Sequence, residues 1–136
     1  LAYFGNYDGV FYCTDLKQKK VLWKTEGGGP FLASPAISGN HVITGSQNKT
    51  VYCYDIRNGK LLWSFKALNK VDASPVITGN YVVVASTDGR LRFLNIATGA
   101  ETWKYEVGRA ISGTPAVTSK MIVVGAGDGK VYAFSK

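Results

Sequence analysis

The sequence predicts an all-β protein made of one repeated unit of four short strands. Three tryptophans, Trp23, Trp63 and Trp103, stand at a constant interval of forty residues. Short runs rich in Val, Ile, Tyr and Phe alternate with Asp-Gly, Asn-Gly and Thr-Gly separators, a pattern typical of strands and tight turns. No stretch of about ten residues has helical periodicity. A fixed period in this range indicates one supersecondary unit that is stacked repeatedly.

Two further columns recur at the same interval as the tryptophans. One holds an acidic or amide residue followed mostly by glycine: Asp8-Gly9, Asn48-Lys49, Asp88-Gly89 and Asp128-Gly129. Because such pairs accept positive φ, we predict a type I′ hairpin turn at each of them. The other column holds a hydroxyl residue followed by proline: Ser34-Pro35, Ser74-Pro75 and Thr114-Pro115. Since proline cannot donate to a strand ladder, it is expected at the start of the first strand of each unit.

Four-stranded units of about forty residues predict the antiparallel blades of a β-propeller. One unit shows the strands most clearly, over residues 73–77, 81–86, 91–95 and 101–105. The first strand of each unit, with its small residues, is expected to be innermost. The chain is predicted to be a single propeller segment of about four blades, over residues 1–26, 33–66, 73–106 and 113–136. The first and last blades lack one strand each, so we expect the chain to be part of a larger ring, or of a dimeric ring, with seven or eight blades.

The composition is that of a globular protein. Hydrophobic residues make up 46% of the chain and charged residues 18%, which is unlike a disordered segment. No run of about eighteen apolar residues predicts a transmembrane segment. The formal net charge of +7 is attributed to dispersed lysine, and no basic–aromatic interleaving points to nucleic acid as a partner. Because the chain opens on residues that already resemble a strand, we expect it to derive from a longer precursor.

The two cysteines, Cys13 and Cys53, occupy one column of adjacent units. Equivalent positions lie about one blade apart, too far for a disulfide, which needs Cα atoms within about 7 Å. Both are therefore expected to be small buried residues. With a single histidine, His41, the chain has no metal-ligand spacing and no nucleophile–base pair, so we predict neither a metal site nor a catalytic residue.

A motif spans the third and fourth strands of the units. It reads Cys13-x-Asp15 followed by Trp23, Cys53-x-Asp55 with Asn58-Gly59 and Trp63, and Phe93-x-Asn95 with Thr98-Gly99 and Trp103. This motif resembles the tryptophan-docking motif of the pyrroloquinoline-quinone-type propeller repeat family. That family includes quinoprotein dehydrogenases and the periplasmic propeller lipoprotein of the outer-membrane β-barrel assembly machinery.

The resemblance implies a structural role for the motif residues. The indole is expected to pack against the next blade, while the Asp or Asn and the Gly hold the turn between the third and fourth strands. These docking residues are Trp23, Trp63, Trp103, Asp15, Asp55, Asn95, Gly59 and Gly99. The first unit has Lys19 where glycine is usual, so a looser turn is expected there.

The same resemblance allows two kinds of function for the chain, that of an enzyme and that of a protein-binding scaffold. In the dehydrogenases it implies a quinone stacked on a tryptophan and a vicinal disulfide, with calcium held by Glu, Asn and Asp. This chain has no vicinal cysteines, and its acidic residues fall mostly in turn columns, so no cofactor is predicted. We interpret the chain as a non-enzymatic scaffold for protein–protein interaction in the bacterial cell envelope, in the periplasm or elsewhere outside the cytoplasm. The alternatives are part of a quinoprotein dehydrogenase propeller, or a ligand-sensing or architectural domain of a larger exported protein.

The loops between blades differ most from unit to unit and are the candidate partner-binding segments. Their candidate residues are Phe31, Leu68, Lys70 and Arg109. Phe31 and Leu68 either anchor a partner or plug the gap between blades. The expected partner is another protein, the rest of a parent chain, or a second copy in a homodimer that closes an eight-bladed ring.

Overall fold

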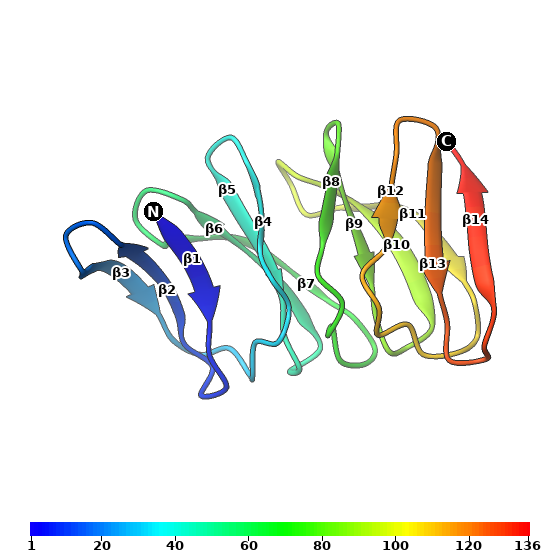
Figure 1. Cartoon of the computed structure of the whole chain (residues 1–136), viewed down its shortest axis with the longest axis horizontal. Coiled ribbons are helices and arrows are strands. Elements are labelled where there is room, and N and C mark those ends of the chain that lie inside the picture. Colours follow the sequence, from blue (N-terminus) through cyan, green and yellow to red (C-terminus); the bar gives the residue numbers. More distant parts are fainter.

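The computed structural model describes all residues, 1–136, and confirms the all-β prediction: the chain has fourteen strands and no helix. The strands form four separate antiparallel sheets that stand side by side, as Figure 1 shows. We number these sheets blade 1 to blade 4 along the chain. The first and last have three strands and the middle two have four, as the repeat predicted.

The strand bounds are as follows. Blade 1 contains β1 (Ala2–Gly5), β2 (Phe11–Asp15) and β3 (Lys20–Thr25). Blade 2 contains β4 (Ala36–Ser38), β5 (His41–Gly45), β6 (Thr50–Asp55) and β7 (Leu61–Lys66). Blade 3 contains β8 (Val76–Thr78), β9 (Tyr81–Ala85), β10 (Arg90–Asn95) and β11 (Glu101–Glu106). Blade 4 contains β12 (Ala116–Val117), β13 (Met121–Gly125) and β14 (Val131–Ser135).

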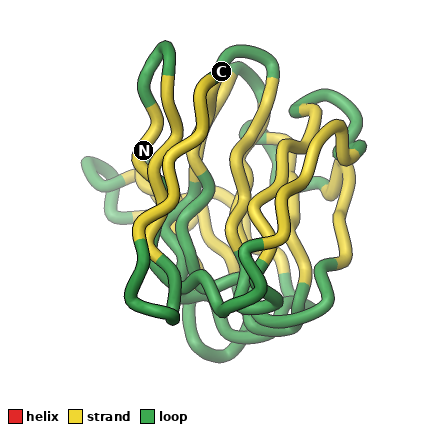
Figure 2. Tube along the Cα trace, turned by 90° about the vertical axis from the view of Figure 1, so that its right-hand side faces the viewer, coloured by secondary structure: helices red, strands yellow, loops and turns green.

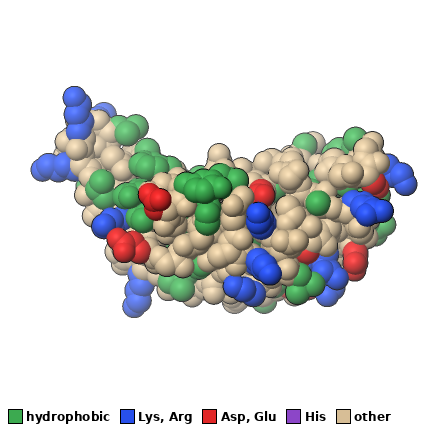
Figure 3. All heavy atoms as spheres, turned by 90° about the horizontal axis from the view of Figure 1, so that it is seen from below, with side chains coloured by type: hydrophobic (Ala, Val, Ile, Leu, Met, Phe, Trp, Pro, Cys, Tyr) green, Lys and Arg blue, Asp and Glu red, His purple; other side chains and the backbone are tan.

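The short strands β4, β8 and β12 line the inner side of the arc. They are the strands that contact one another across blades, which places them nearest the axis. Hydrogen bonds one repeat apart join the segments before them: Ser34 N–H donates to Ser74 Oγ at 2.9 Å, and Ser74 N–H to Thr114 Oγ1 at 3.2 Å. Figure 3, seen from below, shows the resulting arc with a concave inner side. The small hydroxyl residues allow this close approach of neighbouring blades.

Loops gather at the two ends of the strands, as Figure 2 shows. The lower face in Figure 1 carries the turns between second and third strands and the loops between blades. The upper face carries the turns between first and second strands and between third and fourth strands. The two faces therefore present different sets of loops.

The apolar core lies between the blades. In β9, Val82 belongs to the cluster shared with blade 2, and the next residue, Val83, belongs to the cluster shared with blade 4. Successive strand residues point to opposite faces of a sheet, so a blade covered on both faces needs a continuous apolar run. This accounts for the run from Val82 to Ala85, in which every residue is buried.

The prediction of type I′ turns between the second and third strands was wrong. Type I′ geometry needs positive φ at two successive residues, but only the second of each pair has it: Gly9, Lys49, Gly89 and Gly129. The reason is loop length. Gly5 pairs with Phe11, and the Asn6 N–H donates to the Val10 carbonyl at 2.9 Å, so the loop is longer than two residues and reverses with a single left-handed position.

Lys49 occupies that left-handed position with a φ of 71° and an exposed side chain. A side chain bearing Cβ is strained there, whereas glycine is not. We expect Lys49→Gly to raise the free energy of unfolding by about 0.5 to 1 kcal/mol, despite the extra freedom of glycine in the unfolded chain. Urea unfolding measures the change. Lys60→Gly, at an exposed turn position with negative φ, is the control and should lower stability; the same sign for both variants would contradict the argument.

Candidate functional site

Trp63 joins blade 2 to blade 3. Its indole Nε1–H donates to the Ile96 carbonyl at 2.7 Å, and the side chain is only 9% exposed. Gly99 lies against the indole face with a φ of 74°. A Cβ on Gly99 would stand 2.6 Å from Cδ2 of the indole, so only glycine fits both the space and the backbone conformation. The motif therefore places a flat ring against a bare backbone turn.

Trp23 makes the same contact between blade 1 and blade 2. Its Nε1–H donates to the Ile56 carbonyl at 3.1 Å. Gly59 lies under the ring with a φ of 72°, and a Cβ there would stand 2.5 Å from Cε3 of the indole. The two contacts repeat with a separation of one unit.

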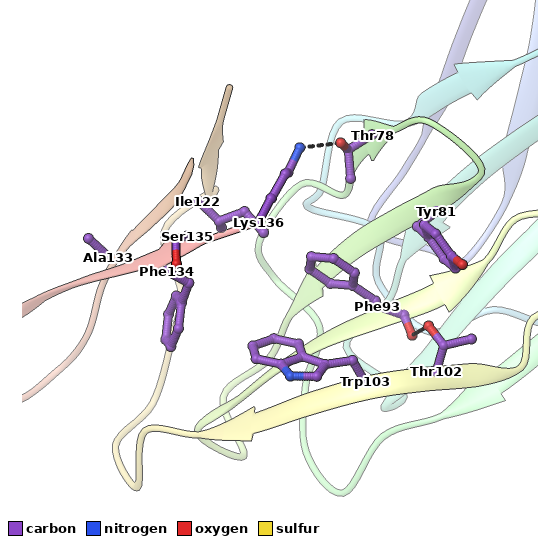
Figure 4. A pocket seen from close by; sticks show the side chains of 10 residues that line it. All are labelled: Thr78, Tyr81, Phe93, Thr102, Trp103, Ile122, Ala133, Phe134, Ser135 and Lys136. Atoms are coloured by element: carbon purple, nitrogen blue, oxygen red, sulfur yellow. Dashed lines mark hydrogen bonds between the residues drawn. The ribbon is translucent and has the colours of Figure 1, made fainter. Parts of the chain in front are cut away.

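Trp103 lies differently, because no turn of the chain covers it. Its side chain is 38% exposed, and its ring packs edge-on against Phe93 and Phe134. Beside it is a cavity of about 770 Å³ between blades 3 and 4. Figure 4 shows Trp103 and Phe93 on one side of this cavity and Phe134 on the other. The third docking tryptophan is therefore a wall of an open, mostly apolar cavity.

The Asp and Asn of the motif close the turns between the third and fourth strands. Asp15 Oδ1 accepts the Lys17 and Gln18 N–H groups, and Asn95 Oδ1 accepts those of Ala97 and Thr98. These are Asx turns, in which an Asp or Asn side chain accepts hydrogen bonds from the backbone two or three residues further along the chain. Lys19 stands where the other units have glycine, and its backbone takes the same left-handed conformation, with a φ of 55°. The turn at Asp15 is therefore not looser than the others.

Asp55 adds an ion pair to this turn. Its carboxylate accepts the backbone N–H of Arg57, and its Oδ2 lies 2.6 Å from a guanidinium nitrogen of the same residue. The side-chain hydrogen bond from Arg57, aided by the backbone one, lowers the pKa of Asp55 to about 2. The carboxylate is therefore ionised at neutral pH and has a structural partner.

Three candidate partner-binding residues gather around one turn of the lower face. The turn Ser86–Arg90 lies between two interblade loops. On one side, Thr87 N–H donates to the Lys70 carbonyl at 2.9 Å, and Leu68 N–H donates to Asp88 Oδ2 at 3.1 Å. On the other side, the loop that carries Arg109 donates two backbone hydrogen bonds, one from its first residues to the Gly89 carbonyl at 2.8 Å and one from its last residues to the Ser86 carbonyl at 3.2 Å. We call the exposed side chains of Leu68, Lys70 and Arg109 the lower-face patch.

Phe31 is not available to a partner. It is 5% exposed and packs edge-on against Phe11 and Tyr52, within the cluster between blades 1 and 2. Of the two roles considered for it, the structure shows the plug between blades. Leu68, in contrast, is 66% exposed.

A buried ionic network beneath the lower-face patch was missed from the sequence. The side chains of Arg92 and Asp88 are both buried, with 2.6 Å between a guanidinium nitrogen and Oδ2. Arg92 also donates to Ser86 Oγ at 2.8 Å and to Glu101 Oε2 at 3.0 Å. The signal was present in the repeat, because this column otherwise holds tyrosine: Tyr12, Tyr52 and Tyr132.

The network keeps Asp88 charged. Burial acts to raise the pKa of Asp88, but hydrogen bonds from Arg92, Ser86 and the Leu68 backbone, together with the Arg92 charge, outweigh it, and the pKa lies below its ordinary value. An ionised Asp88 holds both the turn Ser86–Arg90 and the Leu68 backbone. The patch is therefore built on a fixed base.

Reactive groups do not converge elsewhere. No three His, Cys, Asp or Glu side chains are placed to hold a metal ion. Cys13 and Cys53 are free and buried, and burial, with the nearby Asp55 charge, raises the pKa of the Cys53 thiol to about 12. At neutral pH that thiol is protonated and a poor nucleophile. No helix is long and apolar enough to span a membrane.

Comparison with known proteins places the chain in a family. The model of the outer membrane protein assembly factor BamB family matches residues 47–136, which include the motifs of Trp63 and Trp103, all of blade 3 and blade 4. The chain belongs to the BamB family. The crystal structure of BamB from Moraxella catarrhalis is similar over 98% of this chain, with a TM-score of 0.88 and 26% identity. The chain spans 45% of the length of that BamB structure.

A second solved structure has the same fold. The computationally designed Ika4 protein matches 98% of this chain and 83% of its own, with a TM-score of 0.85 and 22% identity. A chain little longer than this one therefore forms this arrangement of blades. No curated protein sequence matches the chain.

Proposed function

We propose that this BamB-family chain is a non-catalytic scaffold that binds a protein partner in the bacterial cell envelope, on the periplasmic side. Family membership supports the envelope assignment, and the acidic residues support the absence of catalysis. Asp15, Asp55, Asp88 and Asp128 each accept hydrogen bonds within their own turns, so none is directed at a substrate.

The lower-face patch is the proposed contact surface. Its backbone is held by hydrogen bonds to the turn Ser86–Arg90, which itself rests on the buried pair of Arg92 and Asp88. A fixed surface loses little conformational entropy when a partner binds. Leu68 is exposed, and the exposed cations Lys70 and Arg109 lie in the loops on the two sides of the same turn. This arrangement fits a partner segment that presents an apolar side chain beside carboxylates. This combination of a rigid base and an exposed apolar side chain is the observation that carries the proposal.

Photo-crosslinking in cells tests the surface. A photoreactive amino acid at position 68 should give a discrete heavier adduct whose second component, identified by mass spectrometry, is an envelope protein. The control is the same amino acid at position 7, because Tyr7 is exposed to the same degree on the lower face of blade 1. The double substitution Lys70→Glu/Arg109→Glu should abolish the adduct at position 68. Equal adducts at both positions, or one that survives the double substitution, would contradict the assignment.

A further inference from the structure

The outer rim of blades 1 and 2 carries a short sequence that blade 3 lacks. Just before the docking tryptophan, blade 1 has Lys20-Val21-Leu22 and blade 2 has Lys60-Leu61-Leu62, whereas blade 3 has Ala100-Glu101-Thr102. These residues lie at the start of β3, β7 and β11, the outermost strands of their sheets. We call the six residues of blades 1 and 2 the rim stripe. Cations and aliphatic side chains thus recur together at one position of two neighbouring blades.

The aliphatic side chains of the rim stripe are exposed in a blade that is packed on both sides. Leu61 is 49% exposed and Leu62 44%, although blades 1 and 3 flank blade 2 and the next residue, Trp63, is buried. Leu22 is 51% exposed at the same position of blade 1. Large apolar side chains that gather on a surface mark an interaction site, whereas scattered ones do not.

The two halves of the rim stripe lie close together because a docking contact joins them. Trp23 directly follows Leu22, and Gly59, against which the indole of Trp23 packs, directly precedes Lys60. Residues next to a contact in the sequence stay near it in space, since consecutive Cα atoms are about 3.8 Å apart. The stripe is therefore one surface that spans two blades.

The positive charge at the rim stripe is not neutralised within the chain. Four lysines in or beside the stripe are exposed and form no ion pair: Lys17, Lys19, Lys20 and Lys60. The acidic residues of the adjoining turns are already engaged, because Asp15 accepts backbone N–H groups and Asp55 pairs with Arg57. The stripe therefore suits a partner that offers negative charge together with an apolar phase.

The local geometry of the rim favours a broad partner over a bound peptide segment. The ladders of β3 with β2 and of β7 with β6 skip Leu22 and Leu62, so each of these residues is a β-bulge. A bulge twists a free edge and interrupts the regular ladder that an added strand would extend. The two cavities of the molecule lie elsewhere, one beside Trp103 and one among the upper-face turns near His41. A peptide therefore finds neither a regular edge nor a groove at the stripe.

We propose that the rim stripe binds the surface of an anionic lipid bilayer. Its aliphatic side chains enter the boundary between headgroups and acyl chains, while its lysines meet the lipid phosphates. A bilayer surface needs no preformed groove in the protein, which agrees with the absence of a cavity at the rim. The stripe begins next to the upper-face turns, at the opposite end of the strands from the lower-face patch. Both surfaces can therefore be occupied at once.

Sedimentation with lipid vesicles tests the charged part of the stripe. We expect binding to vesicles of equal parts phosphatidylglycerol and phosphatidylcholine to be at least about tenfold tighter than to phosphatidylcholine alone, and to weaken as salt rises. Lys20→Gln/Lys60→Gln should weaken binding to the anionic vesicles about 25-fold, since each cation near such a surface strengthens it roughly fivefold. The control Lys49→Gln/Lys130→Gln removes the same charge from exposed lower-face turns and should change binding by less than about twofold.

A second pair of variants tests the apolar part. Leu22→Asn and Leu62→Asn should each weaken binding to the anionic vesicles about fivefold, because each removes an aliphatic side chain from the lipid boundary. Leu32→Asn is the control, at an aliphatic residue of similar exposure in a lower-face loop, and should leave binding unchanged. All the replaced side chains are exposed, so the fold should be intact, which circular dichroism verifies.

Three results would overturn the proposal. The first is equal binding to neutral and anionic vesicles, which would exclude a role for the lysines. The second is binding that the stripe variants reduce no more than their controls do, which would place the lipid contact on another surface. The third is no binding to either kind of vesicle, which would assign the stripe to an acidic protein segment instead of a bilayer.

Discussion

Trp63→Ala should lower the free energy of unfolding by about 3 to 5 kcal/mol. The substitution removes a large buried ring from between two four-stranded blades and leaves a cavity against Gly99, where the backbone has no side chain to fill it. It also leaves the Ile96 carbonyl without its indole donor. The loss should appear as a lower midpoint in urea unfolding followed by circular dichroism.

Trp103→Ala is the matched control, since it changes the same residue type at the same position of the next unit. Because Trp103 is 38% exposed and has no turn packed on its ring, its removal should cost about 1 to 2 kcal/mol, well below the cost at Trp63. Equal losses at the two positions would show that the tryptophans stabilise their own blades and do not dock on the next one.

Arg92→Met should cost a comparable amount, about 3 to 5 kcal/mol. The variant leaves the Asp88 carboxylate buried without its cation, and the desolvation of that charge is no longer compensated. Because Asp88 also holds the Leu68 backbone, the lower-face patch should loosen at the same time. Faster amide hydrogen exchange at Leu68 and at the turn Ser86–Arg90 would report the loosening.

Two variants separate this ionic effect from a loss of bulk. Arg92→Tyr restores the residue of the other units, and in blade 4 the Tyr132 hydroxyl donates to Asp128 Oδ2 at 2.7 Å. It should recover part of the stability lost in Arg92→Met. Arg90→Met removes a cation whose partner, Glu106, is exposed, and should cost less than about 1 kcal/mol. An Arg92→Met variant as stable as Arg90→Met would show that the buried pair contributes nothing.

Much of the architecture could be predicted because its signals are local and repeat. The β-rich runs, the turn residues and the interval between tryptophans each act within one unit, and together they predicted the all-β propeller and the incomplete first and last blades. The type I′ prediction was wrong because residue type alone does not report the length of a loop. Gly59 and Gly99 were found from their motif, and the structure adds the reason, which is an indole against each backbone.

Contacts between blades decided which side chains are buried, exposed or paired. Trp63 and Trp103 occupy the same position in their units, yet one is buried and the other lines an open cavity. Phe31 and Leu68 both lie in interblade loops, yet only Phe31 packs into a cluster. The pairing of Arg92 with Asp88 likewise depends on how blade 3 packs beside Phe65 of blade 2, over whose ring the guanidinium lies. A repeat specifies the conformation of its own unit, but the exposure and the charge state of a side chain at its surface depend on the neighbouring unit that excludes water from it.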